Sequence, residues 1–232
     1  MTYQELISYL SEKGLEITPA QCEALSRYAA LLKEWNEKMN LTSIVEEPEV
    51  IEKHFLDSAL SAVDYSFAGR KVIDIGSGAG FPGAVIALLF PSAKVTLLDA
   101  TKKKFLFLQT VKDELRLDNL SFLAGRVEEL KEQRESYDVA ISRGFASMRV
   151  YAEVATPLLY VTGTLIAMKG PNGDSEIDEA KNIIRKLSLR LKEKSEFVLP
   201  SGERRIIYYF AKDASTPKRF PRRWDEIQRN KI

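Results

Sequence analysis

The chain has 232 residues, of which 45% are hydrophobic and 29% are charged, so it can bury a sizeable core and is too apolar to be disordered. Its 34 basic and 33 acidic side chains leave a net charge of +1, which excludes a grossly basic chain and indicates no particular partner. A single cysteine, Cys22, and a single histidine, His54, exclude an internal disulfide and a site built on several thiolates or imidazoles. We therefore expect no metal site and a reducing compartment, the cytoplasm.

No run of about 18 apolar residues is present, and the start of the chain is acidic, so we expect neither a membrane span nor a signal peptide. Charge is nevertheless uneven along the chain. Residues 1–65 hold 5 basic and 12 acidic side chains, a net charge of −7, whereas residues 185–232 hold 14 and 6, a net charge of +8. The basic end is a candidate for contacts with an acidic partner.

Apolar residues recur at helical spacing through the first 65 residues, which predicts an N-terminal helical extension of two or three helices. The pair Thr18-Pro19 reads as a helix start, because Thr18 can cap the helix, proline is tolerated at its first position, and Gln21 stands at the capping-box distance. His54 lies in a helical stretch with no second ligand or nucleophile beside it. We expect it to be a satisfied buried histidine rather than a catalytic one.

From residue 71 onward, short β-rich runs alternate with helical stretches, which is typical of an α/β fold with a parallel sheet covered by helices on both faces. The predicted strands are 71–75, 94–98, 120–124, 137–142, 164–168, 195–199 and 204–210, and the predicted helices lie near 82–90, 102–116, 148–160 and 175–191. The loop at 200–203 is too short for a crossover helix, so the last of the seven strands should be antiparallel. We expect one α/β domain over 66–212, followed by a loose basic tail at 213–232.

The strongest local signal is the sequence DIGSGAGFPG at 74–83, where a buried strand runs into a glycine-rich turn and then a helix. Glycines allow backbone to approach a ligand closely, and the helix start offers unpaired N–H groups. Gly78, Gly80 and Gly83 alone satisfy the dinucleotide fingerprint. However, Gly76 and Asp74 already occupy the strand end, where a carboxylate would repel a pyrophosphate but could accept from an ammonium group or a water. This register favours S-adenosylmethionine.

The second predicted strand ends at Asp99, where a carboxylate can accept both hydroxyls of a ribose. Such a contact supports a bound adenosine but does not choose between the two cofactors. The alternative is a surface aspartate that caps the helix beginning near Thr101.

Several motifs together resemble the glucose-inhibited division protein B family, within the class I S-adenosylmethionine-dependent methyltransferases. They are NLTSI at 40–44, HFLDS at 54–58, the loop at 74–83, Asp99 with KKK at 102–104 and FL at 107–108, RVE at 126–128, SRGFA at 142–146 and MKG at 168–170. The resemblance covers about residues 20–212. It implies a Rossmann-like methyltransferase fold and methyl transfer from S-adenosylmethionine to N7 of a guanine in 16S ribosomal RNA, free or in the 30S particle.

The resemblance also implies roles for individual residues. Gly76, Gly78, Gly80 and Phe81 would line the methionine part of the cofactor, Asp99, Ala100 and Thr101 the ribose, and Val127 and Glu128 the adenine edge; Asp74 is added from the register of the loop. Arg143 falls at the mouth of the cofactor pocket, and Lys103, Lys169 and Arg204 match residues near the RNA. The tail keeps only the start of the family's basic segment, so no role is carried over to it.

Methylation of guanine N7 needs no general base, because that nitrogen already has a free lone pair, so positioning must supply the rate. We expect Arg143 to position the target nucleotide through O6 or a phosphate, because a hydrogen bond to N7 would block the reaction. The base should be extruded or single-stranded and stack on Phe81, Phe145 or Arg143; core packing is the alternative for the two phenylalanines. Binding to RNA should weaken with salt.

Two other functions remain open from the residues alone. A nicotinamide-dependent oxidoreductase would bind NAD(H) and not S-adenosylmethionine. An RNA-binding ribosome assembly factor with a vestigial cofactor site would bind RNA regardless of the glycine loop. We expect the protein to be a monomer.

Overall fold

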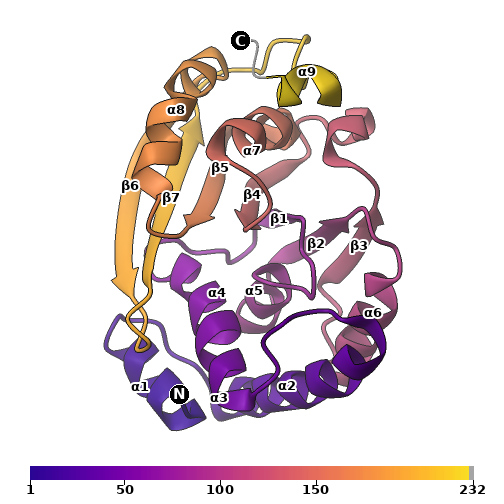
Figure 1. Cartoon of the computed structure of the whole chain (residues 1–232), viewed down its shortest axis with the longest axis vertical. Coiled ribbons are helices and arrows are strands. Elements are labelled where there is room, and N and C mark those ends of the chain that lie inside the picture. Colours follow the sequence, from indigo (N-terminus) through magenta and orange to yellow (C-terminus); the bar gives the residue numbers. More distant parts are fainter. Residues whose placement is uncertain (230–232) are drawn as a thin grey trace.

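A seven-stranded sheet forms the centre of the molecule, with the strand order β3-β2-β1-β4-β5-β7-β6 (Figure 1). The computed structural model describes residues 1–229. The strands are β1 (Lys71–Ile75), β2 (Lys94–Asp99), β3 (Leu120–Ala124), β4 (Tyr137–Arg143), β5 (Leu159–Lys169), β6 (Leu189–Val198) and β7 (Arg204–Lys212). β7 pairs antiparallel with both β5 and β6, whereas the other four strand pairs of the sheet are parallel. The predicted seven-stranded sheet with an antiparallel last strand is confirmed.

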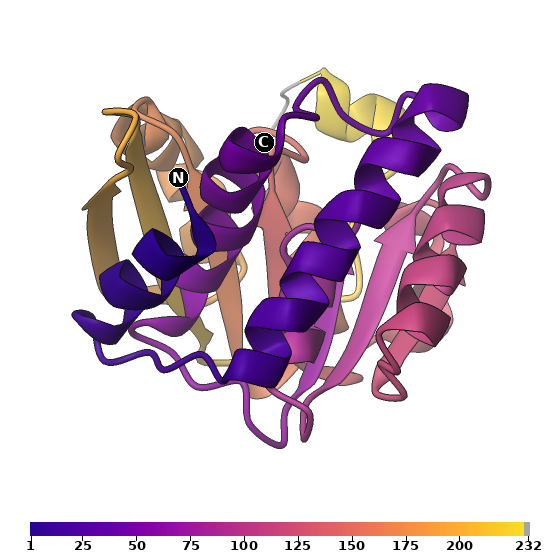
Figure 2. The same cartoon turned by 90° about the horizontal axis from the view of Figure 1, so that it is seen from below.

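Helices cover both faces of this sheet (Figures 1 and 2). One face carries α1 (Tyr3–Ser11), α2 (Pro19–Met39), the continuous helical segment α3 (Glu47–Val50), η1 (Ile51–Leu56), α4 (Asp57–Ala59) and η2 (Leu60–Ala62), then α5 (Gly83–Leu89) and α6 (Lys104–Glu114). The other carries α7 (Met148–Ala155), η5 (Thr156–Leu158), α8 (Gly173–Lys186) and α9 (Trp224–Gln228), and the short turns η3 (Val127–Glu129) and η4 (Lys131–Gln133) follow β3. Within residues 1–229, every helix is too short or too polar to cross a membrane.

The alternating side chains of β1 divide the core into two clusters. Val72 packs with the cluster beneath the N-terminal helices, α5 and α6, whereas Ile73 and Ile75 pack with the cluster beneath α7 and α8. Tyr28 and Phe55, from the N-terminal helices, belong to the same cluster as Val72 and are fully buried. The N-terminal helices therefore share one apolar core with the sheet, and the division of the chain at residue 66 stays a prediction.

The start of α2 agrees with the sequence, whereas the end of α8 does not. The Thr18 side chain accepts from the Gln21 N–H at 3.2 Å and the Gln21 side chain accepts from the Thr18 N–H at 2.9 Å, which confirms the capping box. α8 ends at Lys186 rather than near residue 191, and Ser188 has a left-handed φ of 54°. The leucines and cations that follow alternate with the period of a strand, so β6 begins at Leu189.

The C-terminal segment, residues 214–229, is packed against the body of the protein. Thr216, Phe220 and Ile227 are buried, and the Glu153 carboxylate of α7, which has no exposed area, pairs with Arg222 at 2.6 Å. The prediction of a loose tail is therefore wrong for this segment, because two apolar anchors and a buried ion pair hold it down. Residues 230–232 of the predicted tail lie outside the described part of the chain.

Arg222→Ala should lower the free energy of unfolding by about 3 kcal/mol, since removing one partner leaves the Glu153 carboxylate buried without compensation. The neighbouring Arg223 pairs with Asp225 at the surface, with 81% of its side chain exposed, so Arg223→Ala should change stability by less than about 0.5 kcal/mol. Urea unfolding of both variants provides the measurement. Equal losses in the two variants would contradict the role given to the buried pair.

Candidate functional site

The carboxyl ends of four adjacent parallel strands surround a pocket of about 340 Å³. It lies where the strand order reverses, between β1 and β4, which is where open α/β sheets bind ligands. The residues that line it are Ile75, Gly76, Leu98, Asp99, Ala100, Lys104, Gly125, Arg126, Val127, Glu128, Gly144, Phe145 and Trp224. Five residues expected to bind the cofactor from the sequence, Gly76, Asp99, Ala100, Val127 and Glu128, are thus brought together. We call this the strand-end pocket.

The glycine loop after β1 needs glycine for two different reasons. Gly76, Gly78 and Gly80 all have left-handed φ angles, of 73°, 59° and 95°, which residues other than glycine rarely adopt. A Cβ on Gly76 would come within 2.7 Å of the Phe145 ring at the strand-end pocket, whereas a Cβ on Gly80 would come within 2.3 Å of the Tyr28 hydroxyl in the core. Gly76 therefore keeps the pocket open, and Gly80 allows the loop to pack on α2.

Asp99 is the most strongly hydrogen-bonded acceptor in the strand-end pocket. Its carboxylate accepts from the Gly78 N–H at 3.0 Å, the Thr101 N–H at 2.8 Å and Lys104 Nζ at 2.9 Å. Burial by itself raises the pKa of Asp99, but the hydrogen bonds from Lys104, Thr101 and Gly78 outweigh it and lower the pKa. The group is thus an ionised acceptor, and a carboxylate with about four lone-pair sites still has capacity for a hydroxyl.

Asp74 lies behind the loop rather than in the pocket. Its side chain is fully buried, Oδ2 accepts from the Gly83 N–H at 2.8 Å, and Oδ1 has no hydrogen-bond partner among the described residues. Burial raises its pKa to about 7, against smaller opposing contributions from the Gly83 N–H and Arg143. Among the other expected cofactor residues, Gly80 and Phe81 are also buried outside the pocket wall, and Thr101 contributes its N–H to Asp99.

A second, larger pocket of about 790 Å³ adjoins the first at Gly144. Its lining comes from the N-terminal helices, the turn after β4, the end of β5 and the β6–β7 loop. Four cations, Lys53, Arg143, Lys169 and Arg205, and three carboxylates, Asp57, Glu176 and Glu203, face this space. We call it the basic pocket, because its cations outnumber its carboxylates.

Arg143 is held in the basic pocket by the helical segment 47–62. Its guanidinium donates to the Lys53 carbonyl at 2.7 Å, to Asp57 Oδ2 at 3.1 Å and to His54 Nδ1 at 3.1 Å, and lies 5.5 Å from the Phe81 ring centroid. None of the described residues accepts from its Nε–H. The fixed guanidinium therefore keeps a donor for a ligand.

His54 supports Arg143 as a neutral acceptor. Its ring stacks on Phe81 at a centroid distance of 4.4 Å, and Nε2 lies 3.0 Å from Thr42 Oγ1. Because Arg143 can only donate, Nδ1 must be the unprotonated nitrogen. Burial first, and the Arg143 charge second, lower the pKa of His54 to about 3. The expectation of a satisfied buried histidine is confirmed.

The three residues that resemblance places near RNA lie in different surroundings. Lys103 is exposed at the start of α6. Lys169 is mostly buried in the basic pocket, where Nζ donates to the Ala146 carbonyl at 2.7 Å and to Glu176 at 2.8 Å. Arg204 lies outside the basic pocket and pairs with Glu196 at 2.6 Å.

Arg205 and Trp224 are among the pocket residues that the sequence did not predict. Arg205, rather than Arg204, lines the basic pocket and donates to Asp57 Oδ2 at 3.2 Å, so it shares that oxygen with Arg143. The alternation of side chains along a strand predicts that Arg204 and Arg205 face opposite sides of the sheet. Which side holds the pocket depends on how the strands pair. Trp224 lies in a segment whose packing the sequence did not predict.

Comparison with known proteins gives consistent matches. The family model described as "rRNA small subunit methyltransferase G" matches residues 21–207. Two curated relatives named ribosomal RNA small subunit methyltransferase G, from Streptococcus gordonii and Lysinibacillus sphaericus, are 38% and 40% identical, with 96% of each chain covered.

Solved structures show the same fold at low identity. A 16S rRNA (adenine(1408)-N(1))-methyltransferase mutant from Catenulisporales acidiphilia matches with a TM-score of 0.54 and 11% identity, covering 65% of this chain and 88% of its own. A SAM-dependent methyltransferase from Aquifex aeolicus matches with a TM-score of 0.52 and 17% identity, covering 72% and 95%. The sheet is therefore that of the class I methyltransferases.

The buried Asp74 should make stability depend on pH. With its pKa raised to about 7, the folded state keeps a proton that the unfolded chain loses near pH 4, so the free energy of unfolding should fall as pH rises between these values. From pH 5 to pH 8, wild type should lose about 2 to 3 kcal/mol more than Asp74→Asn, measured by urea unfolding. Asp118→Asn, at an exposed carboxyl, should follow wild type. Parallel profiles for wild type and Asp74→Asn would overturn the prediction.

Proposed function

Because the chain belongs to the rRNA small subunit methyltransferase G family, we propose that it transfers a methyl group from S-adenosylmethionine to N7 of a guanine in 16S ribosomal RNA. The observation that carries the proposal is that two pockets meet at Gly144. The strand-end pocket suits a nucleoside, and the basic pocket suits a nucleotide. A methyl group presented from one pocket can then meet a base held in the other. The expected surroundings are the cytoplasm and a monomeric enzyme.

The residues of the strand-end pocket fit an adenosine with an amino-acid tail. Asp99 offers an ionised carboxylate to a ribose hydroxyl, and Val127 and Glu128 lie after β3, where an adenine edge would rest. The opening that Gly76 leaves beside Phe145 admits the part of the ligand that crosses the sheet end. When bound, S-adenosylmethionine supplies an electrophilic methyl group on a sulfonium.

The basic pocket supports positioning without proton transfer. Guanine N7 needs no base, and a histidine with a pKa of about 3 would be a poor one at neutral pH. Arg143 is held by three acceptors and keeps Nε–H for O6 or a phosphate, so the orienting group is fixed before the substrate arrives. Arg205 places a second guanidinium beside it, and two such groups suit a phosphate of the target strand.

The direct test incubates the protein with radiolabelled S-adenosylmethionine and small ribosomal subunits from a strain lacking the enzyme, followed by mapping of the modified base. Label at N7 of one guanine in 16S ribosomal RNA is expected. Label on protein or on a small molecule would overturn the substrate. Binding of NAD(H) without S-adenosylhomocysteine would select the oxidoreductase instead, and RNA binding without any transfer would select the assembly factor.

Gly78→Arg should abolish methyl transfer while leaving the fold intact. A Cβ at Gly78 meets nothing nearer than 4.0 Å, and the added guanidinium can reach Asp99, the group proposed to hold the ribose. Gly69→Arg is the matched control, because Gly69 has a similar φ of 71° and open surroundings but precedes β1 at its opposite end. Equal activity of the two variants, with circular dichroism spectra like wild type, would contradict the prediction.

Arg205→Gln should lower kcat/KM for the small subunit by about tenfold and leave the Kd of S-adenosylhomocysteine unchanged, as expected for the loss of one charge-assisted phosphate contact. It should also reduce the salt slope of RNA binding by about one. Arg204→Gln, which removes a cation already paired with Glu196 outside the pocket, should cost less than about threefold. A larger loss of kcat/KM in Arg204→Gln than in Arg205→Gln would support Arg204 as the RNA contact, as the resemblance implies.

A further inference from the structure

The C-terminal segment brings a tryptophan into the wall of the strand-end pocket. Trp224, the first residue of α9, lines this pocket together with Asp99, Glu128 and Phe145. It lies beyond residues 21–207, which the family model matches. Its role must therefore be argued from the contacts of this chain.

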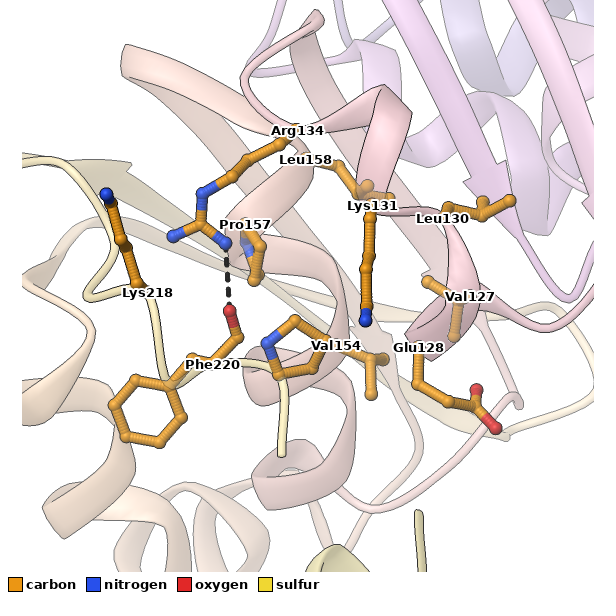
Figure 3. Close-up of a pocket in the computed structure, with 11 residues that line it drawn as sticks. Val127, Glu128, Leu130, Lys131, Arg134, Val154, Pro157, Leu158, Lys218 and Phe220 are labelled. Atoms are coloured by element: carbon orange, nitrogen blue, oxygen red, sulfur yellow. Dashed lines mark hydrogen bonds between the residues drawn. The ribbon is translucent and has the colours of Figure 1, made fainter. Parts of the chain in front are cut away.

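Arg134 fixes the first part of the segment. Its guanidinium donates to the carbonyls of Thr216, Pro217 and Phe220, the last at 2.8 Å (Figure 3). The segment there closes a cavity of about 400 Å³, whose lining includes Val127 and Glu128. These two residues also line the strand-end pocket, so the segment runs directly from this cavity to the edge of the proposed cofactor site.

Two further anchors from α7 fix the part that carries Trp224. The Glu153 carboxylate accepts from Arg222 Nε at 2.7 Å and from the Arg222 N–H at 3.1 Å, and Arg149 donates to the Ile227 carbonyl at 2.8 Å. These contacts lie on either side of Trp224 in the sequence. The position of its backbone is thus set by neighbours rather than by its own side chain.

The indole of Trp224 is only partly buried, although it packs against the apolar cluster beneath α7. Phe220 and Ile227 are buried and supply the apolar anchoring of the segment. A large aromatic ring that leaves part of its surface on a pocket is available to a flat ligand. Phe145 gives the same pocket a second aromatic side chain.

We propose that Trp224 is a cofactor-binding residue whose indole covers the adenosine of S-adenosylmethionine. The proposal rests on the proposed function, since it needs an adenosine in the strand-end pocket. The adenine ring is flat and aromatic, and stacking on a tryptophan suits any base because every base has a π-face. The C-terminal segment then completes the cofactor site from outside the four strand ends.

Fluorescence can report on Trp224 directly, because the chain has only two tryptophans. In Trp35→Phe, which changes the residue packed against Phe107 on the opposite face, Trp224 is the sole tryptophan. Titration of this variant with S-adenosylhomocysteine should quench or shift its emission. An unchanged emission, with binding demonstrated by calorimetry, would overturn the proposal.

Calorimetry of Trp224→Ala measures the loss of cofactor affinity that the proposal predicts. Its Kd for S-adenosylhomocysteine should rise about tenfold, within the range of about 5- to 150-fold expected for loss of one stacked base, whereas Trp224→Phe should retain most of the affinity. The Kd of 5′-methylthioadenosine, which lacks the amino-acid group, should rise by the same factor. A loss confined to S-adenosylhomocysteine would overturn the assignment to adenosine, and so would wild-type affinity in Trp224→Ala.

The controls separate this proposal from its premise and from misfolding. If wild type binds neither ligand, the proposed function fails, whereas ligand binding that is indifferent to Trp224 overturns only the present proposal. Thermal unfolding followed by circular dichroism checks that Trp224→Ala is folded. Should it unfold, Trp224→Leu, which keeps apolar bulk without an aromatic face, must show the same loss of affinity for the proposal to stand.

Discussion

The path of the glycine loop depends on the hydrogen bond that the buried Asp74 carboxyl accepts from the Gly83 N–H. This bond ties the end of β1 to the first residue of α5, and a Cβ on Gly83 would come within 2.8 Å of Asp74. On the other side of the loop, the Tyr28 hydroxyl donates to the Ala79 carbonyl at 2.6 Å. These contacts hold the loop at Ala79 and Gly83 before any ligand is bound, with Gly76 in the wall of the strand-end pocket and the Gly78 N–H donated to Asp99.

The helices that precede the sheet are part of the same arrangement. Tyr28 holds the glycine loop, His54 and Asp57 hold Arg143, and Asp57 also receives Arg205 from β7. Asp57 Oδ2 thus joins the N-terminal helices to two strands that lie apart in the sheet. Forming a buried ionic cluster adds little to the free energy of folding, whereas removing one of its partners is strongly destabilising. The cluster therefore fixes the geometry of these side chains more than it stabilises the fold.

Sequence patterns predicted the parts of the molecule that depend on neighbours along the chain. The strand runs, the capping box at Thr18 and the loop glycines are local signals, and Asp99 follows from the position of a strand end. Arg205 and Trp224 could not be predicted in this way, because their places depend on which strands pair and on contacts made by Arg134 and Glu153 far away in the sequence. The error at β6 had a local cause, since alternating leucines and cations were assigned to the preceding helix.

Pairing also changes what the basic end of the chain can offer to an RNA. The net charge of +8 over residues 185–232 counts every cation, but Arg190, Lys194, Arg204, Lys212 and Arg222 all form ion pairs within the fold. Arg185, Lys186, Lys192, Lys218 and Arg219 form none with residues 1–229, and Lys102 and Lys103 are exposed at the start of α6. Attraction to phosphate would therefore come mainly from unpaired cations in separate parts of the chain rather than from the C-terminal charge as a whole. Arg143 and Arg205 are themselves paired with Asp57, so they would contribute through hydrogen bonds in the basic pocket.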